Sequence, residues 1–210
     1  MLEQFFISLS ISHIFKMVVY ILYAKADLQG VASAALIPGA NLCISVRNPL
    51  YHSEVRENVV IDSSDLIEPS DGNGKWETSD VHNKHHHQEH PHHFSLKWDG
   101  EKEKSTIRVL DGSETAAEAL KASSTKRKNN HQSEETREIR GEDSGDFVPI
   151  LAVECQGLEP FAFHPMGGEF LVTSKAGVTF DEVDLSEGKW ETFDLGTGTT
   201  QIANFETKFA

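Results

Sequence analysis

Residues 147–193 constrain the fold of this chain more than any other stretch. Apolar alternation, turn residues and aromatic side chains coincide there for more than forty residues. Phe147 to Cys155 is apolar on both faces and rich in β-favouring residue types, which predicts a strand covered on both sides. Gln156-Gly157 and then Pro160 end this strand. The stretch therefore predicts a hairpin-rich β-module.

The same pattern continues to the C-terminus. Phe161 and Phe163 lie two positions apart in an extended segment, so their side chains are expected on the same face. Residues 196–200 resemble a phosphate-binding loop only loosely, because no lysine and no helix follow, and the alternation from Ile202 to Phe209 favours a hairpin loop before a strand. Four aromatic residues are expected to fill the core of this module: Trp190, Phe193, Phe205 and Phe209.

Ordered motifs in this half resemble a known family. They are Glu154-Cys155-Gln156-Gly157-Leu158-Glu159-Pro160, Phe163, Pro165, Gly168-Glu169-Phe170, Gly177-Val178-Thr179-Phe180, Val183-Asp184-Leu185 and Glu187-Gly188-Lys189-Trp190. These motifs are similar to the C-terminal half of the eukaryotic CXXC-motif-containing zinc-binding proteins, also known as uncharacterised protein family 0587. The resemblance implies a small cytosolic, mostly β protein of two similar modules. It also implies that two Cys-x-x-Cys pairs hold zinc in the N-terminal module.

The N-terminal half carries signs of a second module. Ala26 to Val31 echoes Val153 to Leu158, since each is a strand end that runs into Gln-Gly and an aliphatic residue, 127 positions apart. Strands are expected over residues 18–28, 42–47 and 55–61. We therefore predict a mainly β fold made of two similar small β-sandwich or barrel-like modules joined by a disordered linker.

The expected boundaries follow from composition. No aromatic residue occurs from Asp99 to Asp146, which favours disorder in the middle of the chain. The predicted parts are an N-terminal extension (1–16), an N-terminal β-module (17–110) with a mobile acidic and His-rich loop (62–93), a disordered linker (111–146) and a C-terminal β-module (147–210).

The first residues allow two interpretations. Phe5 to Phe15 followed by Val18 to Ala24 is apolar enough to suggest a signal anchor, but Lys16 interrupts it and no cleavage pattern follows. The alternative is that Met17 opens the ancestral chain and residues 18–28 form its first strand. We favour the second interpretation and expect no membrane partner; whether residues 1–16 belong to the mature protein stays open.

Charge and cysteine content bound the partners and the compartment. The net charge is −14, and residues 146–210 contribute eleven acidic and three basic side chains, or −8, which argues against nucleic acid. An acidic surface suits a basic protein partner, or it simply keeps the protein soluble. The only two cysteines, Cys43 and Cys155, have apolar neighbours, which favours buried thiols in a reducing, cytoplasmic compartment.

Zinc is the main question about the function. A structural zinc site needs four ligands, and the chain has no Cys-x-x-Cys pair. Extending the resemblance places Pro49 and His52 at the first paired positions and Trp98 and Glu101 at the second; a one-residue slip gives Asn48 and Tyr51 instead. Neither register restores a site, so we expect that the zinc of the family is lost and that the chain has no cofactor.

A histidine tract offers weaker metal candidates. Clustered neutral imidazoles bind Zn, Ni or Cu ions, but a loop without supporting contacts fixes no geometry. The tract holds seven imidazoles in twelve residues: His82, His85, His86, His87, His90, His92 and His93.

No catalytic motif is present. The chain lacks a Gly-x-Ser-x-Gly elbow, a Gly-x-x-x-x-Gly-Lys loop and a His-Glu-x-x-His helix. We therefore expect no enzymatic activity and no catalytic residues. The expected function is that of a β-scaffold protein that binds a partner, with metal binding or delivery through the histidine tract as the alternative. The sequence leaves the oligomeric state open.

Overall fold

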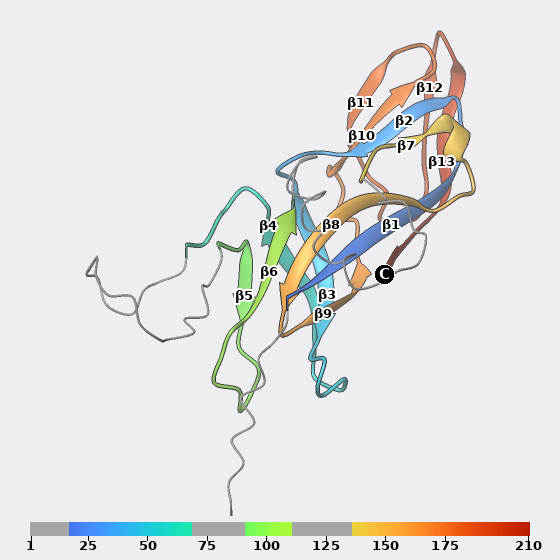
Figure 1. The fold of residues 1–210 in the computed structure, drawn as a ribbon. Helices are drawn as coiled ribbons and strands as arrows, with labels where there is room; N and C mark the ends of the chain where they lie inside the picture. The colour runs from blue at the N-terminus through green and yellow to red at the C-terminus, as the bar shows by residue number, and fades with distance from the viewer. Residues whose placement is uncertain (1–16, 69–90, 111–135) are drawn as a thin grey trace, which may run out of the picture.

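The computed structural model describes residues 17–68, 91–110 and 136–210, and these residues form a mainly β protein (Figure 1). They contain no α-helix, and their one helical element is a 3-10 turn at Gly141–Asp143. No helix in the described ranges is long and apolar enough to span a membrane. The prediction of a mainly β fold is confirmed.

The largest sheet is antiparallel, with the strand order β12-β13-β1-β8-β6-β5. Its strands are β1 (Val18–Gln29), β5 (Phe94–Leu96), β6 (Ser105–Leu110), β8 (Val148–Gln156), β12 (Trp190–Asp194) and β13 (Gly198–Phe209). Strand β1 lies at the centre, because its first half pairs with β8 and its second half pairs with β13. Its even-numbered residues alternate inward, as Leu22, Ala24 and Ala26 are all buried.

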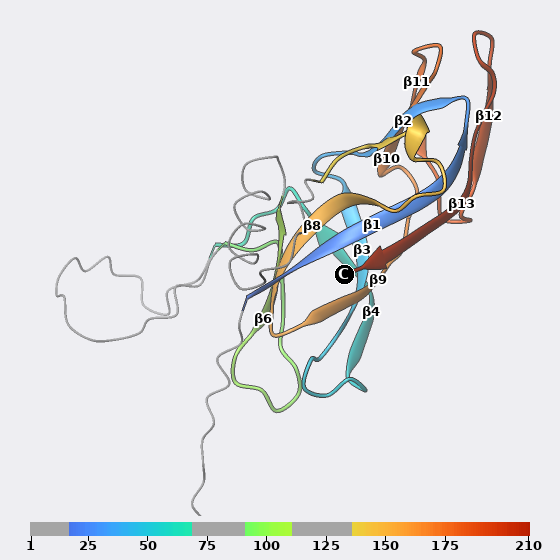
Figure 2. The same ribbon diagram turned by 45° about the vertical axis from the view of Figure 1, so that its right-hand side comes forward.

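Two smaller sheets pack with the large one, in the orders β11-β10-β2-β7 and β4-β3-β9. Their strands are β2 (Val31–Leu36), β3 (Asn41–Arg47), β4 (Val55–Asp62), β7 (Ile139–Arg140), β9 (Glu159–Phe163), β10 (Phe170–Ser174) and β11 (Thr179–Val183). The molecule is elongated, with two lobes at opposite ends (Figures 1 and 2). We call the lobe with β3–β6, β8 and β9 the first lobe and the lobe with β10–β13, β1 and β2 the second lobe.

The strands repeat one plan twice. In the large sheet β1 and β8 are central neighbours, β13 and β6 lie outside them, and β12 and β5 form the edges. In the small sheets β3 and β10 are each flanked by the following strand and by the second strand of the other repeat. Each repeat therefore gives its first two strands, β1–β2 or β8–β9, to the lobe built by the hairpins of the other.

The Gln-Gly echo in the sequence marks equivalent turns of the two repeats. Gly30 follows β1, Gly157 follows β8, and both have φ of +70°. A Cβ atom at Gly30 would lie 2.7 Å from the carbonyl oxygen of Thr199, so this turn also requires a residue without a side chain.

The predicted division into modules 17–110 and 147–210 is not confirmed. Strands from both segments share the large sheet, and β2 and β9 each pair with a strand of the other segment. A single core cluster combines buried residues of both, among them Leu22, Trp98, Phe170 and Ile202. The exchange follows from long-range pairing, which a local sequence pattern does not encode.

The predicted disordered linker, 111–146, is not confirmed either, because residues 136–146 belong to the fold. Ile139 is 1% exposed and lies in β7, which pairs with β2. The Arg137 guanidinium binds the Asp143 carboxylate at 2.6 Å, and Gly145 N donates to Ala26 O. One buried isoleucine and this ion pair dock a segment that contains no aromatic residue.

Part of the predicted mobile loop, 62–93, is also ordered. Asp62 is the last residue of β4, and Ile67 forms an antiparallel bridge with His92. Residues 69–90 lie outside the described ranges.

Two aromatic residues differ from their predicted orientation. Phe163 is buried, but Phe161 is 37% exposed, because the β3–β9 register shifts there and Phe161 is the extra residue of a bulge. Phe193 is 70% exposed and does not fill the core, since it lies on the outer face of β12. Trp190, Phe205 and Phe209 are half-buried against the core.

The strand predicted over residues 18–28 is present as β1. Val18 to Ala24, the second half of the apolar stretch, pairs with β8 as part of β1. Residues 1–16 lie outside the described ranges.

Candidate metal centre

The paired positions suggested by the resemblance lie on two hairpin ends of the first lobe. Pro49 and His52 are exposed on the turn between β3 and β4. Trp98 and Glu101 lie on the turn between β5 and β6, where Trp98 is 1% exposed and Glu101 is half-buried. The guanidinium of Arg56, at the start of β4, lies 5.2 Å from the centre of the Trp98 ring, so the two hairpin ends are in contact.

Hydrogen bonds close the first turn. The Nδ2 atom of buried Asn48 donates to Glu54 Oε2 at 2.8 Å, and the Asn48 Oδ1 atom accepts the backbone N–H of Leu50 at 2.9 Å. The backbone of Asn48 pairs with Glu54, and Glu54 N donates to Tyr51 O. Asn48-Pro49 is a turn-forming pair, which is the signal in the sequence for this arrangement.

The second turn is fixed by a buried indole. Trp98 Nε1 donates to Gly157 O at 2.9 Å, and the Ser105 hydroxyl donates to the same oxygen at 2.8 Å. The Arg56 guanidinium lies over one face of the Trp98 ring, and the Gly157 carbonyl oxygen accepts the hydrogen of its ring nitrogen. A positive charge over an indole ring is favourable in itself.

This donor set does not fit a four-ligand zinc site. Proline has no free side-chain donor atom, and the Trp98 nitrogen carries a hydrogen that is already donated. The slipped register is no better, since Asn48 holds the turn through its amide and Tyr51 is 59% exposed. No group of three or more His, Cys, Asp or Glu side chains within residues 17–68, 91–110 and 136–210 is arranged to hold a metal ion.

The equivalent position in the second lobe carries a hydrogen-bonded cluster that the sequence analysis missed. Buried Asp194 ends β12, and its Oδ2 atom accepts the hydroxyl groups of Ser174 at 2.7 Å and of Thr197 at 3.0 Å. Its Oδ1 atom accepts the N–H of Gly196 at 2.9 Å. These bonds join the β10–β11 turn to the β12–β13 turn.

The N–H of Gly196, followed by the hydroxyl of Ser174, lowers the pKa of Asp194. The sequence signal is Asp-x-Gly, an Asx turn.

Two members of the histidine tract fall within the described residues. His92 is 7% exposed, and His93 Nδ1 accepts the backbone N–H of Val109 at 2.9 Å. Because that ring nitrogen is occupied, His93 supports the end of β6. The other five candidates, His82, His85, His86, His87 and His90, lie outside the described ranges.

A second polar cluster lies on the outer face of β3. Ser45 Oγ lies 2.8 Å from His164 Nε2 and accepts the backbone N–H of Asn58 at 3.2 Å. Buried Glu169 accepts the N–H of Met166 through Oε1. Since Ser45 is 1% exposed, these contacts hold the loop after β9 against β3.

Both cysteines are free and buried, as predicted. Burial raises the pKa of the Cys155 thiol strongly, and burial followed by the nearby Glu169 carboxylate raises that of Cys43. Neither thiol is therefore activated as a nucleophile or as a metal ligand.

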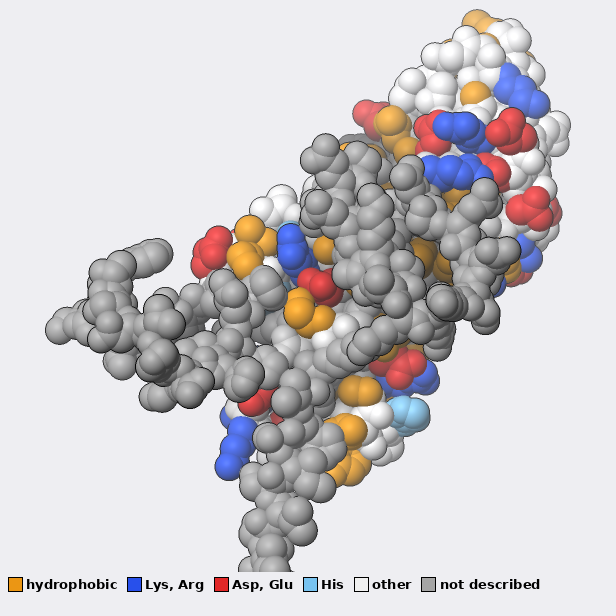
Figure 3. Space-filling model, viewed as in Figure 1, with side chains coloured by type: hydrophobic (Ala, Val, Ile, Leu, Met, Phe, Trp, Pro, Cys, Tyr) orange, Lys and Arg blue, Asp and Glu red, His pale blue; other side chains and the backbone are white. Residues whose placement is uncertain are grey.

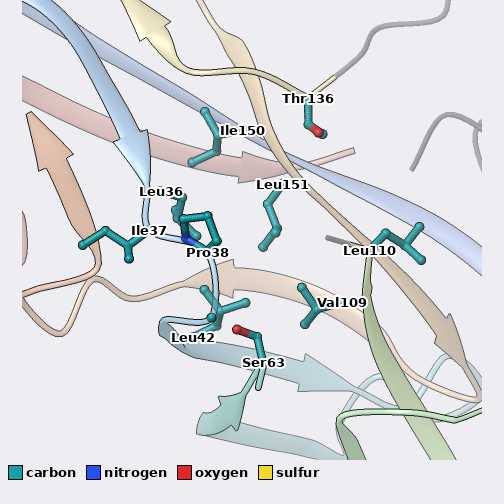
Figure 4. A pocket seen from close by; sticks show the side chains of 11 residues that line it. Leu36, Ile37, Pro38, Leu42, Ser63, Val109, Leu110, Thr136, Ile150 and Leu151 are labelled. Carbon is teal, nitrogen blue, oxygen red and sulfur yellow. The ribbon is translucent and has the colours of Figure 1, made fainter. Parts of the chain in front are cut away.

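A cavity of about 70 Å³ lies between the β2–β3 connection, β6 and β8 (Figure 4). Leu36, Leu42, Val109, Ile150 and Leu151 supply most of its apolar wall, and Ser63 and Thr136 supply hydroxyl groups. The Ser63 hydroxyl donates to Ala40 O. Among the described residues, no titratable side chain lines the cavity. The cavity therefore has no side chain that could act as an acid, a base or a metal ligand.

The fold and this site define a two-lobed, mainly β protein with a hairpin-end centre in each lobe. The family model described as "CXXC motif containing zinc binding protein, eukaryotic" matches residues 21–210, and the chain belongs to this family.

Individual relatives match shorter stretches. The chain is 39% identical over 69 residues to UPF0587 protein CG4646 of Drosophila melanogaster. This match covers 32% of this chain and 42% of the relative. It is 27% identical over 103 residues to the CXXC motif containing zinc binding protein of Homo sapiens, with 48% of this chain and 64% of the relative covered. The chain thus spans less than two thirds of the length of these relatives.

Two solved structures share the fold. One is a hypothetical protein from Plasmodium falciparum and the other is C1orf123; each has a TM-score of 0.67 and covers 92% of this chain and 99% of its own. Their sequence identities to this chain are 16% and 17%.

Proposed function

We propose that this chain is a non-enzymatic scaffold of its family, in which packing and hydrogen bonds replace a structural zinc ion, and that it works by binding a partner protein in the cytoplasm. The burial of Trp98, with its indole N–H on Gly157, carries this proposal. A side chain at the second pair that cannot bind metal removes one of the four ligands that a shared zinc ion needs.

Both hairpin-end centres support the proposal in the same way. In the first lobe Asn48 and Glu54 close one turn, Trp98 anchors the other, and the Arg56 guanidinium over the Trp98 ring joins the two hairpins. In the second lobe Asp194 bonds to hydroxyl groups on two turns. Each centre joins two hairpins by direct contacts, which is the task that a structural zinc ion would perform.

A partner-binding role is supported by exposed apolar residues on ordered turns. Leu195 is 97% exposed, Phe193 is 70% exposed and Tyr51 is 59% exposed, and all three lie at or next to hairpin turns at the two ends of the molecule. Phe193 and Leu195 lie two positions apart at one hairpin end, and neighbouring exposed apolar side chains of this kind are a feature of protein interaction sites.

Metal content of the full chain, purified without a tag, tests the loss of zinc. We expect far less than one metal ion per chain by elemental analysis. A variant with all seven tract histidines replaced by asparagine is the control. Near-stoichiometric zinc in this variant would contradict the proposal, whereas metal that disappears with the histidines would favour metal delivery through the tract.

A further inference from the structure

Within the described residues, six strands form the edges of the three sheets, and five of them carry a feature that hinders pairing with another chain. Strand β5 has three residues and β7 has two. Strand β9 contains Pro160 and the bulged Phe161. Strand β4 is bulged at Asn58, whose φ is +54°, and β11 is bulged where its register with β10 shifts between Phe170 and Val172.

Strand β12 is the exception. Its five residues run in unbroken register with β13 and include no proline. Within the described residues, no backbone hydrogen bond joins residues 190–194 to any strand other than β13. Glu191 and Phe193 point outward from this strand, and Leu195 follows on the turn. The edge is therefore long enough and regular enough to accept a further strand.

The end of this edge is held rigid before any partner binds. The carboxylate of Asp194 bonds to Ser174 and Thr197, and Ala176 N donates to the Thr197 hydroxyl at 2.9 Å. Figure 3 shows an apolar group at the outermost tip of the second lobe. A preorganised surface loses less conformational entropy on binding, which favours affinity.

We propose that β12 binds an extended segment of a partner protein as an added strand. The segment carries an apolar residue beside Phe193 and a lysine or arginine beside Glu191, two positions apart, because side chains on one face of a sheet recur with a period of two. This inference rests on the proposed partner-binding function and names the surface and the chemistry of the partner.

Charge favours a basic partner over a second copy of the chain. Asp181, Glu187 and Glu191 are exposed in this lobe, and residues 146–210 carry a charge of −8 from eleven acidic and three basic side chains. Pairing between two copies would bring together chains with a net charge of −14 each. Opposite charges on neighbouring strands stabilise pairing and like charges oppose it.

Fluorescence anisotropy with a labelled eight-residue peptide tests the proposal on the full chain. The peptide has valine and lysine two positions apart on a threonine background. We expect saturable binding that Glu191→Lys weakens about fivefold or more, and that a peptide with glutamate in place of lysine restores binding to this variant. Phe193→Asp should weaken binding, while Val60→Asp, on the bulged edge of β4 where Val60 is 53% exposed, should leave it unchanged.

Backbone chemistry distinguishes an added strand from adhesion to apolar side chains. N-methylation of alternate peptide amides removes the donors of one edge, so one of the two alternate methylation patterns should abolish binding and the other should not. Absence of saturable binding would overturn the proposal. Binding that is unchanged by Glu191→Lys and by each of the two methylation patterns would also overturn it. A concentration-dependent dimer that Phe193→Asp disrupts would assign the edge to a second copy. None of these results bears on metal content, so failure here is separable from failure of the proposed loss of zinc.

Discussion

The indole of Trp98 and the carbonyl oxygen of Gly157 are joined by a buried hydrogen bond of 2.9 Å, 59 residues apart in the chain. Gly157 belongs to the turn that one repeat gives to the lobe of the other. The equivalent Gly30 oxygen accepts the N–H of Lys175 at 2.8 Å in the second lobe. The exchanged turns are thus fastened to the hairpin ends in both lobes, and stability and assembly depend on these contacts.

Replacement of Trp98 by alanine should be severely destabilising. Removing a fully buried tryptophan costs roughly 3 to 5 kcal/mol, through lost burial and the cavity that remains. Trp98→Phe keeps most of the ring and should cost about 1 to 2 kcal/mol, because the Ser105 hydroxyl still satisfies Gly157 O. Urea unfolding followed by circular dichroism measures both.

Trp190→Ala is the matched control for this prediction. Trp190 is half-buried and meets Phe180 edge to face at 5.3 Å, so its loss should cost less than the loss of Trp98. A cost for Trp98→Ala no larger than that for Trp190→Ala would contradict the prediction that the buried Trp98 contributes more to stability.

A proteolytic cut within residues 111–135 should not release an independent C-terminal fragment. Strands β1 and β2 complete the sheets of the second lobe, while β8 and β9 complete those of the first, so each fragment alone leaves several strands unpaired. Size-exclusion chromatography of the cut protein should give one peak that contains both fragments and separates only in denaturant. Two separate, folded fragments under native conditions would instead support contiguous modules.

Substitution of Gly30 should test the close approach of the exchanged turn. Gly30→Ala strains a backbone with φ of +70° and places a Cβ 2.7 Å from Thr199 O. Gly39 has φ of +79° but open space around it, so Gly39→Ala reports backbone strain alone, about 1 kcal/mol. We expect a clearly larger loss of unfolding free energy at Gly30. Equal losses would show that the turn tolerates a side chain.

Asp194 should make the second lobe sensitive to acid. Its pKa is lowered in the fold by the N–H of Gly196 and then by the hydroxyl of Ser174. A carboxyl with a lowered folded pKa stabilises the fold above its ordinary pKa, about 3.9, and this contribution disappears as the pH falls toward the folded pKa. The stability difference between wild type and Asp194→Asn, measured by urea unfolding, should therefore shrink below pH of about 4. A difference that stays constant with pH would exclude this role.

Local patterns in the sequence predicted individual strands better than their assembly. The apolar run before Gln156 and the alternation after Ile202 became β8 and β13, because strand pattern and turn chemistry are local properties. The exchange of β1–β2 and β8–β9 depends on pairing between strands far apart in the chain, such as Leu22 with Phe209 and Ile44 with Phe163. The bulge that exposes Phe161 depends on the register of β9 with β3. Neither the strand exchange nor this bulge can be recognised from the local periodicity of the sequence.

The candidate centres were predictable only in part. The side-chain chemistry of Pro49 and Trp98 predicted from the sequence that zinc is lost, but not which contacts would replace it. Arg56 over the Trp98 ring comes from a neighbouring strand, and Ser174 meets Asp194 from a different sheet. Such contacts are set by the packing of hairpins, which the spacing of residues does not reveal.

Thermal unfolding of the untagged protein with and without EDTA tests most directly whether direct contacts have replaced the structural zinc. A zinc ion that holds a small domain together contributes on the order of 10 kcal/mol, so its removal unfolds the domain. We predict the same Tm with and without the chelator, because Trp98, Asn48 and Glu54 fix the hairpin ends. A chelator-induced fall in Tm that persists when the seven tract histidines are replaced would contradict this, since a metal ion would then have to hold the fold together at another site.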